Sequence, residues 1–332
     1  ENGGKNGAID RFDALLSSEQ EYVTNTWNWR WPKISEAAKL INALEPQIGE
    51  NQQAKTMWAE ASCIRGQIMM DMTMLYGRVP VIDISRMEEL GTRRQDLTTV
   101  WTYIIHDLTV AANNAPETNN PGRVTRYVGL MLLGYAYMSA PVETGLRDFS
   151  KAEECLRQVV NGPFSLVPYY DLFDYSTPNT SEAILEFQFN NPQPDNNMIE
   201  FEVGSRLAYS MGQDACYFSG FDHAVPTPWA YSDIEDGGIW EDGDVRKEES
   251  IRYEFTWNGK NALDYLDGLS WEGLSEDDQD EHKPHIKKYE DFRTDIQSGF
   301  GYNNMWYCGK NIPWLRLGNA YLLYAECLNE LN

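Results

Sequence analysis

Tryptophans are the residues of this chain whose type and spacing most directly suggest a binding surface. Trp27, Trp29 and Trp31 fall within the segment TWNWRWP, which ends at Pro32. On a helix, Trp27, Trp31 and Ile34 share one face and Trp29 points away from it. Proline is tolerated in the first turn of a helix, so we expect the helix to begin near Trp31. The spacing predicts that Trp31 packs in the core and that Trp29 offers its ring to a flat ligand. Trp27 suits either role.

A second group of aromatic residues lies between about 190 and 310. This stretch has little helical periodicity and many Gly, Pro, Asn and Asp residues. Loops longer than about 15 residues are uncommon unless they are functional, so we expect a site here. Trp257 and Trp271 flank the polar segment WNGKNALDYLDGLSWEG. The aromatic candidates, each of which could instead pack within a local loop core, are Trp229, Trp240, Trp257, Trp271, Trp306, Tyr217, Phe218, Phe221 and Tyr302.

Carboxylates are abundant in the same stretch and leave an enzyme open as an alternative. A glycoside hydrolase needs two carboxyl groups at a defined separation, but with this many acids a pair can always be chosen. The run DIEDGGIWEDGD suggests calcium, yet Gly237 stands where an EF-hand loop needs an oxygen ligand. His282 and His285 are separated by Pro284, which breaks a helical metal-binding face. We expect no catalysis, cofactor or metal.

Composition narrows the choice of partners. The 332 residues carry 27 basic and 51 acidic side chains, a formal net charge of -24. Such a field repels phosphate backbones, so nucleic acid is a poor partner. No stretch approaches the roughly 18 apolar residues of a membrane-spanning helix. The cysteines are odd in number and widely spaced, which favours single buried thiols over disulfides or a zinc site; they are Cys63, Cys155, Cys216, Cys308 and Cys327.

Helical patterns dominate the N-terminal half. Met57, Ala61, Ile64, Ile68, Met72 and Leu75 form a stripe on a helix that Gly77 and Pro80 end. Asp96 is the expected N-cap of a second helix, whose stripe is Val100, Ile104, Leu108 and Ala111. Further helices are expected over 124–139, apolar all round, and 150–160. Helices joined by short loops predict an array of tetratricopeptide-like hairpins. Small residues that allow close helix contacts support this prediction: Gly134, Ala136, Ala152 and Ala325.

Several segments of the chain follow one another in the order found in one known protein family. WAEASCIRGQIMMDMTMLYGRVPVI (58–82) carries the similar pattern of Glu60, Ala61, Arg65, Gly66, Tyr76, Gly77, Val79 and Pro80. The likeness continues at VWTYIIHDLTVAANNAP (100–116), GRVTRYVGLMLLGYAYM (122–138) and YYDLFDYSTPNTSEAILEFQF (169–189), where EAILEFQF (182–189) also reads as a strand. It resumes at Asp244 and Arg246, at Lys288 and Tyr289, and in IPWLRLGNAYLLYAECLNEL (312–331). Trp27, Trp31 and Ile34 match the start of the family's first scaffold helix. In these segments the chain resembles the SusD/RagB-like nutrient-binding lipoproteins of Bacteroidetes outer membranes.

The resemblance implies one mainly α-helical SusD-like domain over 1–332, which we expect to be truncated at both ends. Residues 10–162 and 310–332 would form the tetratricopeptide-like scaffold. Residues 163–309 would form a loop-rich elaboration with short strands that carries the ligand. The sequence ends inside the helical pattern LRLGNAYLLYAECLNELN without a C-cap, so we expect the domain to continue.

The resemblance also implies a function: capture of an oligo- or polysaccharide at the cell surface and delivery to a SusC-like TonB-dependent transporter. The protein would be an outer-membrane lipoprotein, held by an N-terminal lipid anchor that precedes this chain. Flat aromatic side chains suit the apolar C–H face of a sugar ring. The residues expected to bind carbohydrate are Trp27, Trp29, Trp240, Trp257, Trp271, Tyr302 and Trp306. Alternatives are a peptide-binding RagB-like protein and, less favoured, a glycoside hydrolase.

Overall fold

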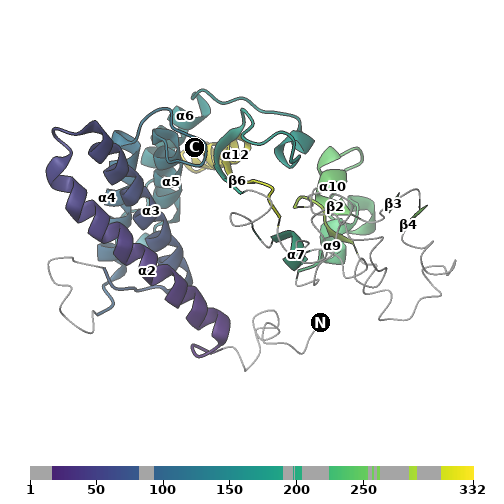
Figure 1. Ribbon diagram of the computed structural model, residues 1–332. Coiled ribbons are helices and arrows are strands. Elements are labelled where there is room, and N and C mark those ends of the chain that lie inside the picture. Colours follow the sequence, from purple (N-terminus) through teal and green to yellow (C-terminus); the bar gives the residue numbers. More distant parts are fainter. Residues whose placement is uncertain are drawn as a thin grey trace. The chain divides into compact units, whose positions relative to one another are not determined.

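The computed structural model divides the chain into two compact units (Figure 1). The first unit comprises residues 1–165 and 315–332, and the second comprises residues 166–314. Within them the structure describes residues 17–81, 93–189, 197, 199–203, 224–252, 256–257, 260–261, 284–289 and 308–332.

The first unit is an array of helices in which each helix packs against the next. α2 packs on α3, α3 on α4, α4 on α5, α5 on α6, and α6 on α12, although α12 is far along the chain from α6 (Figure 1). The helices are α2 (Glu21–Leu44), α3 (Gln52–Tyr76), α4 (Leu97–Asn114), α5 (Arg126–Ser139), α6 (Phe149–Val160) and α12 (Leu317–Glu330). Short 3-10 turns, η1 (Glu45–Gln47) and η3 (Val142–Thr144), lie between helices. The predicted helical scaffold is confirmed.

Helix ends follow the local signals in the sequence. The Asp96 side chain accepts a hydrogen bond from the Thr99 backbone N–H at 2.9 Å, which satisfies a donor that the first turn of α4 leaves free. Asn51 caps α3 and Asp148 caps α6 in the same way. Gly77 ends α3 with a φ of 70°, a left-handed value that a side chain disfavours.

Small residues bring some of these helices close together. A Cβ added at Gly129 on α5 would lie 2.5 Å from the backbone nitrogen of Ala112 on α4. A Cβ at Gly134 would lie 2.9 Å from the Leu156 side chain on α6. The same prediction is wrong for Ala325, which lies on the exposed side of α12. The core face of α12 is formed instead by its buried residues Leu317, Ala320 and Cys327.

Pro32 lies inside α2, so the prediction that the helix begins near Trp31 is wrong. α2 begins at Glu21, because the side chain of Gln20 accepts a hydrogen bond from the Tyr22 backbone N–H at 2.7 Å and caps the helix there. An interior proline removes one helical hydrogen bond and costs about 3 kcal/mol. Packing of α2 along α3 offsets this cost. The three tryptophans of TWNWRWP therefore sit on one continuous helix.

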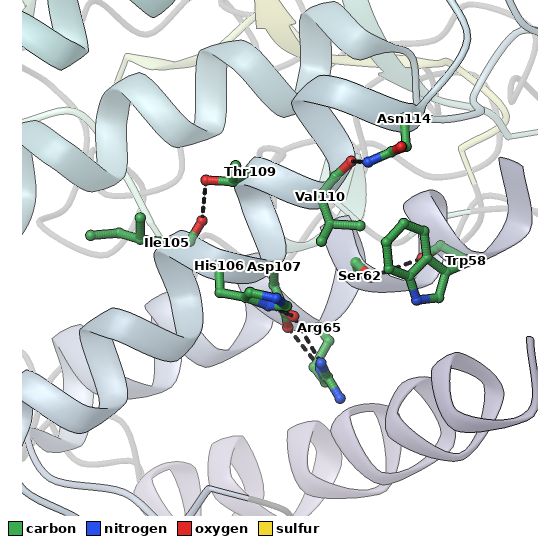
Figure 2. Close-up of polar contacts among 9 residues, drawn as sticks. All are labelled: Trp58, Ser62, Arg65, Ile105, His106, Asp107, Thr109, Val110 and Asn114. Carbon is green, nitrogen blue, oxygen red and sulfur yellow. Dashed lines mark hydrogen bonds and ion pairs between the residues drawn. The ribbon is translucent and has the colours of Figure 1, made fainter. Parts of the chain in front are cut away.

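A buried ion pair joins α3 to α4 (Figure 2). Arg65 donates from Nε to Asp107 Oδ2 at 2.7 Å and from Nη2 to Oδ1 at 2.8 Å. The guanidinium carbon lies 4.6 Å from the centre of the Tyr103 ring. Asp107 is fully buried, so this bidentate contact compensates a charge that would otherwise be costly. His106 Nδ1 lies 3.4 Å from Asp107 Oδ1, and this contact raises the pKa of His106.

The second unit contains short elements joined by loops. Its helical turns are η4 (Tyr169–Leu172), α7 (Ile199–Val203), α9 (Pro228–Tyr231), η6 (Ile234–Asp236) and α10 (Val245–Ser250). The described strands pair in twos: β1 (Ala183–Phe187) with β6 (Ile312–Arg316, whose last two residues belong to the first unit), β2 (Ile251–Arg252) with β5 (His285–Ile286), and β3 (Thr256–Trp257) with β4 (Lys260–Asn261). The last two pairs are antiparallel. The strand predicted over 182–189 is confirmed as β1.

Four cysteines are free and buried: Cys63, Cys155, Cys308 and Cys327. Burial raises the pKa of the Cys63 thiol to about 12, so it stays protonated and unreactive at neutral pH. This agrees with the prediction of single buried thiols, while Cys216 lies outside the described residues. Among the described helices, none is long and apolar enough to cross a membrane.

Candidate carbohydrate-binding surfaces

The tryptophans on α2 separate into packed rings and one exposed ring. Trp27 and Trp31, one helical turn apart, meet edge to face with ring centres 5.2 Å apart. Trp27 also meets Tyr76 of α3 edge to face at 5.1 Å. The Tyr76 hydroxyl donates to the Val23 carbonyl oxygen at 2.6 Å, which ties the end of α3 to α2. Trp29 lies outside this cluster and is 66% exposed.

This arrangement makes Trp29 a rigidly mounted aromatic surface. Its backbone is held by a helix of 24 residues whose neighbouring turns are fixed by the Trp27–Trp31–Tyr76 cluster. The backbone that carries the ring is therefore already ordered before a ligand binds. Trp29 therefore has the exposure and the support that a sugar-stacking residue needs.

A second aromatic surface lies on the loop that runs from α9 to α10 in the second unit. The Trp240 indole N–H donates to the carbonyl oxygen of Ala230 at 2.8 Å, and Asp233 forms a backbone bridge with Trp240. These contacts close the loop on itself and leave Trp240 half-buried. Trp229 is 63% exposed beside this closure. Further exposed apolar side chains of the segment are Val225, Ile234, Ile239 and Val245.

Two of the six acidic side chains of this loop, Asp233 and Asp244, form ion pairs. Asp233 Oδ1 lies 2.7 Å from Lys247 Nζ. Asp244 accepts from the Arg246 guanidinium, and this hydrogen bond holds the pKa of Asp244 below its usual range. Among the described residues, no three His, Cys, Asp or Glu side chains are grouped to hold a metal ion. Asp233 and Asp244 thus form ion pairs that hold the two ends of the loop.

The first unit also has a groove of about 450 Å³ between α2, α3 and residues 122–124. The one largely buried acid in it, Glu60, accepts hydrogen bonds from Arg123 Nε at 2.8 Å and from Asn119 Nδ2 at 2.9 Å. Its carboxylate is thus fixed and neutralised. The apolar floor is made by Ala37, Leu40, Met57, Ala61, Ile64, Ile68 and Val124. This groove includes part of the apolar stripe predicted for α3, whose Ile64 is exposed.

The predicted site residues fall in different parts of the chain. Trp27 and Trp29 lie in the first unit and Trp240 in the second. Trp257 lies in β3, but its side chain is outside the described residues. Trp271, Tyr302 and Trp306 are also outside them.

Sequence reasoning missed one aromatic pair, Phe187 and Trp314. Their rings stack with centres 5.2 Å apart and planes inclined by 20°. Alternation in the segment EAILEFQF, which places Phe187 and Leu185 on the same side of the strand, was the available signal for Phe187. Its pairing with Trp314 required knowledge of the β1–β6 sheet.

Solved structures of known proteins have a fold similar to that of this chain. A laminarin-binding SusD-like protein superposes with a TM-score of 0.69 at 23% identity, over 91% of this chain and 66% of the other. A SusD superfamily protein from Parabacteroides distasonis superposes with a TM-score of 0.74 at 22% identity. The match covers 99% of this chain and 67% of the other. A crystal structure solved with xylogluco-oligosaccharide superposes with a TM-score of 0.60 at 20% identity. The match covers 94% of this chain and 61% of the other. No curated protein sequence matches the chain.

These likenesses define the class: the chain has the fold of SusD-like proteins and spans about two thirds of the length of these solved structures. Residues 181–332 match the model of the SusD family. The fold and this C-terminal match both agree with the family resemblance of the sequence motifs.

Proposed function

We propose that this protein is a non-catalytic, cell-surface glycan-binding protein that captures oligo- or polysaccharide and delivers it to a TonB-dependent outer-membrane transporter. The observation that carries the proposal is an exposed, rigidly mounted tryptophan, Trp29, on a fold shared with proteins described as binding laminarin or solved with xylogluco-oligosaccharide. The transporter, the lipid anchor and the outer-membrane location follow from the family resemblance.

The chemistry of the described surfaces supports saccharide as the ligand. A sugar ring has an apolar face of C–H groups, and each aromatic contact with it contributes on the order of 0.5–1.5 kcal/mol beyond buried area. Trp29 and Trp229 are each more than half exposed, so their rings are accessible to such a face. We include Trp27 and Trp240 as residues whose ring edges complete these surfaces, and Trp257, Trp271, Tyr302 and Trp306 as the expected contacts of the loop-rich part.

The absence of catalysis is part of the proposal. Hydrolysis of a glycosidic bond needs one carboxyl group kept protonated and a second kept ionised and free. Asp233 and Asp244 are instead held by Lys247 and Arg246. Such ion pairing supports a role in fixing the loop.

Isothermal titration of the wild-type protein against a panel of polysaccharides tests the proposal. Laminarin and xyloglucan are included together with oligopeptides, and reducing-sugar release is measured on the same samples. We expect saturable binding to at least one glycan without release of reducing ends. Sustained release that disappears in a single variant such as Asp236→Asn would identify a hydrolase and overturn the proposal. Affinity for peptides and for none of the glycans would support the RagB-like alternative.

A further inference from the structure

We infer that the stacked pair Phe187 and Trp314 is an additional saccharide-stacking platform, separate from the predicted tryptophans. The inference rests on the proposed function, because it takes a glycan as the ligand class. Phe187 ends β1 and Trp314 lies on β6, so the pair is formed only when these strands join. Both residues belong to the second unit.

The pair is stacked and partly exposed. The two ring centres are 5.2 Å apart and the planes are inclined by only 20°, so the rings are stacked with an offset. Phe187 is 45% exposed, so part of this residue is accessible to solvent beside the stacked contact. Two neighbouring aromatic rings, one of them partly exposed, offer a larger flat apolar area than a single ring, and such an area suits a flat apolar partner.

A network of amide groups holds the two strands together where the platform forms. Asn311 Oδ1 accepts from the Phe189 backbone N–H at 2.9 Å. Asn311 Nδ2 donates to Glu186 Oε2 at 3.2 Å and to Gln188 Oε1 at 3.0 Å. Gln188 and Asn179 exchange two further amide hydrogen bonds of 2.8 and 3.0 Å.

The network lies on the side of β1 opposite to the platform. Side chains alternate along a strand, so Glu186 and Gln188 point away from the face that carries Phe187. The amides therefore fix the register of β1 and β6 without occupying the ring surface. Because the rings are positioned before ligand arrives, binding there costs little ordering entropy. A flat, apolar and preorganised surface matches the C–H face of a hexose ring in a bound glycan chain.

The test replaces the aromatic ring of Phe187 with an apolar side chain that has no ring. Phe187→Leu is compared with Tyr170→Leu, which alters another exposed aromatic residue of the second unit. Titration calorimetry uses laminarin- and xyloglucan-derived oligosaccharides of increasing length. For the glycan that the wild type binds, we expect Phe187→Leu to weaken affinity about 2- to 10-fold, and Tyr170→Leu to leave it unchanged.

A second readout is independent of affinity. In protein labelled with 5-fluorotryptophan, the Trp314 resonance is assigned by its disappearance in Trp314→Phe. It should shift on titration with the same oligosaccharide. Binding by the wild type with no change in Phe187→Leu and no shift at Trp314 overturns this inference alone. A lowered melting temperature with unchanged affinity assigns the pair to packing and also overturns it. Failure of the wild type to bind any glycan overturns both this inference and the proposed function.

Discussion

Two substitutions on the same helix, Trp29→Ala and Trp31→Ala, should separate binding from stability. Trp29 is 66% exposed, and alanine is a better helix former than tryptophan, so its replacement should change the free energy of unfolding by less than about 0.5 kcal/mol. Loss of one stacking ring should weaken glycan binding by about 0.5–1.5 kcal/mol, roughly 2- to 13-fold in Kd.

The expectation for Trp31 is the reverse. It is half-buried and meets Trp27 edge to face at 5.2 Å. Replacing a fully buried tryptophan costs about 3–5 kcal/mol, so a half-buried ring should cost roughly 2 kcal/mol of unfolding free energy. Glycan affinity of the folded fraction should stay near that of the wild type.

Urea denaturation followed by circular dichroism gives the unfolding free energies, and isothermal titration gives Kd for the glycan that the wild type binds. Tyr135→Ala, which removes a partly exposed ring on α5, serves as the control for affinity and should leave Kd unchanged. Equal losses of affinity and of stability in Trp29→Ala and Trp31→Ala would refute the division between an exposed binding ring and a packed ring.

Three further predictions concern the scaffold. Asp107→Asn, measured by urea denaturation, should lose about 3–5 kcal/mol of unfolding free energy because it leaves Arg65 buried without its counter-charge; a loss below about 1 kcal/mol would contradict this. Gly129→Ala should lower the melting temperature, with a cost of about 1–3 kcal/mol, because a Cβ there meets α4 backbone at 2.5 Å. Gly49→Ala, with nothing within 4 Å of an added Cβ, is its control and should not lower it. His106, whose pKa is raised by Asp107, should titrate above about 6.5 by NMR. The stability contributed by its protonated ring should be present below that pH and lost as pH rises through the raised pKa; a pKa below 6.5 would count against it.

Much of the first unit could be predicted from local patterns. Val100, Ile104, Leu108 and Ala111 recur at helical spacing, and all four are buried on α4. Caps and breakers such as Asp96 act through hydrogen bonds within one turn, so their effect is visible in the sequence. Pro32 shows the limit of this reasoning, because packing of α2 on α3 outweighs the local preference for a helix start.

The candidate site could be predicted only in part. Helical spacing separated Trp29 from the face of Trp31, and the structure places them accordingly. The spacing could not show that Trp27 would pack between Trp31 and Tyr76, because Tyr76 belongs to another helix. The predicted residues Trp257, Trp271, Tyr302 and Trp306 remain expectations.

The sequence by itself determined where most helices of the scaffold lie and which family the chain resembles, because both depend on spacing and order along the chain. Only the tertiary structure decided which side chains meet across elements: Arg65 with Asp107, and Phe187 with Trp314. These contacts join residues far apart in sequence, and their energy depends on burial and ring geometry that no local pattern encodes. The stacking of Phe187 on Trp314 is such a contact, so the proposed additional platform could be found only from the fold.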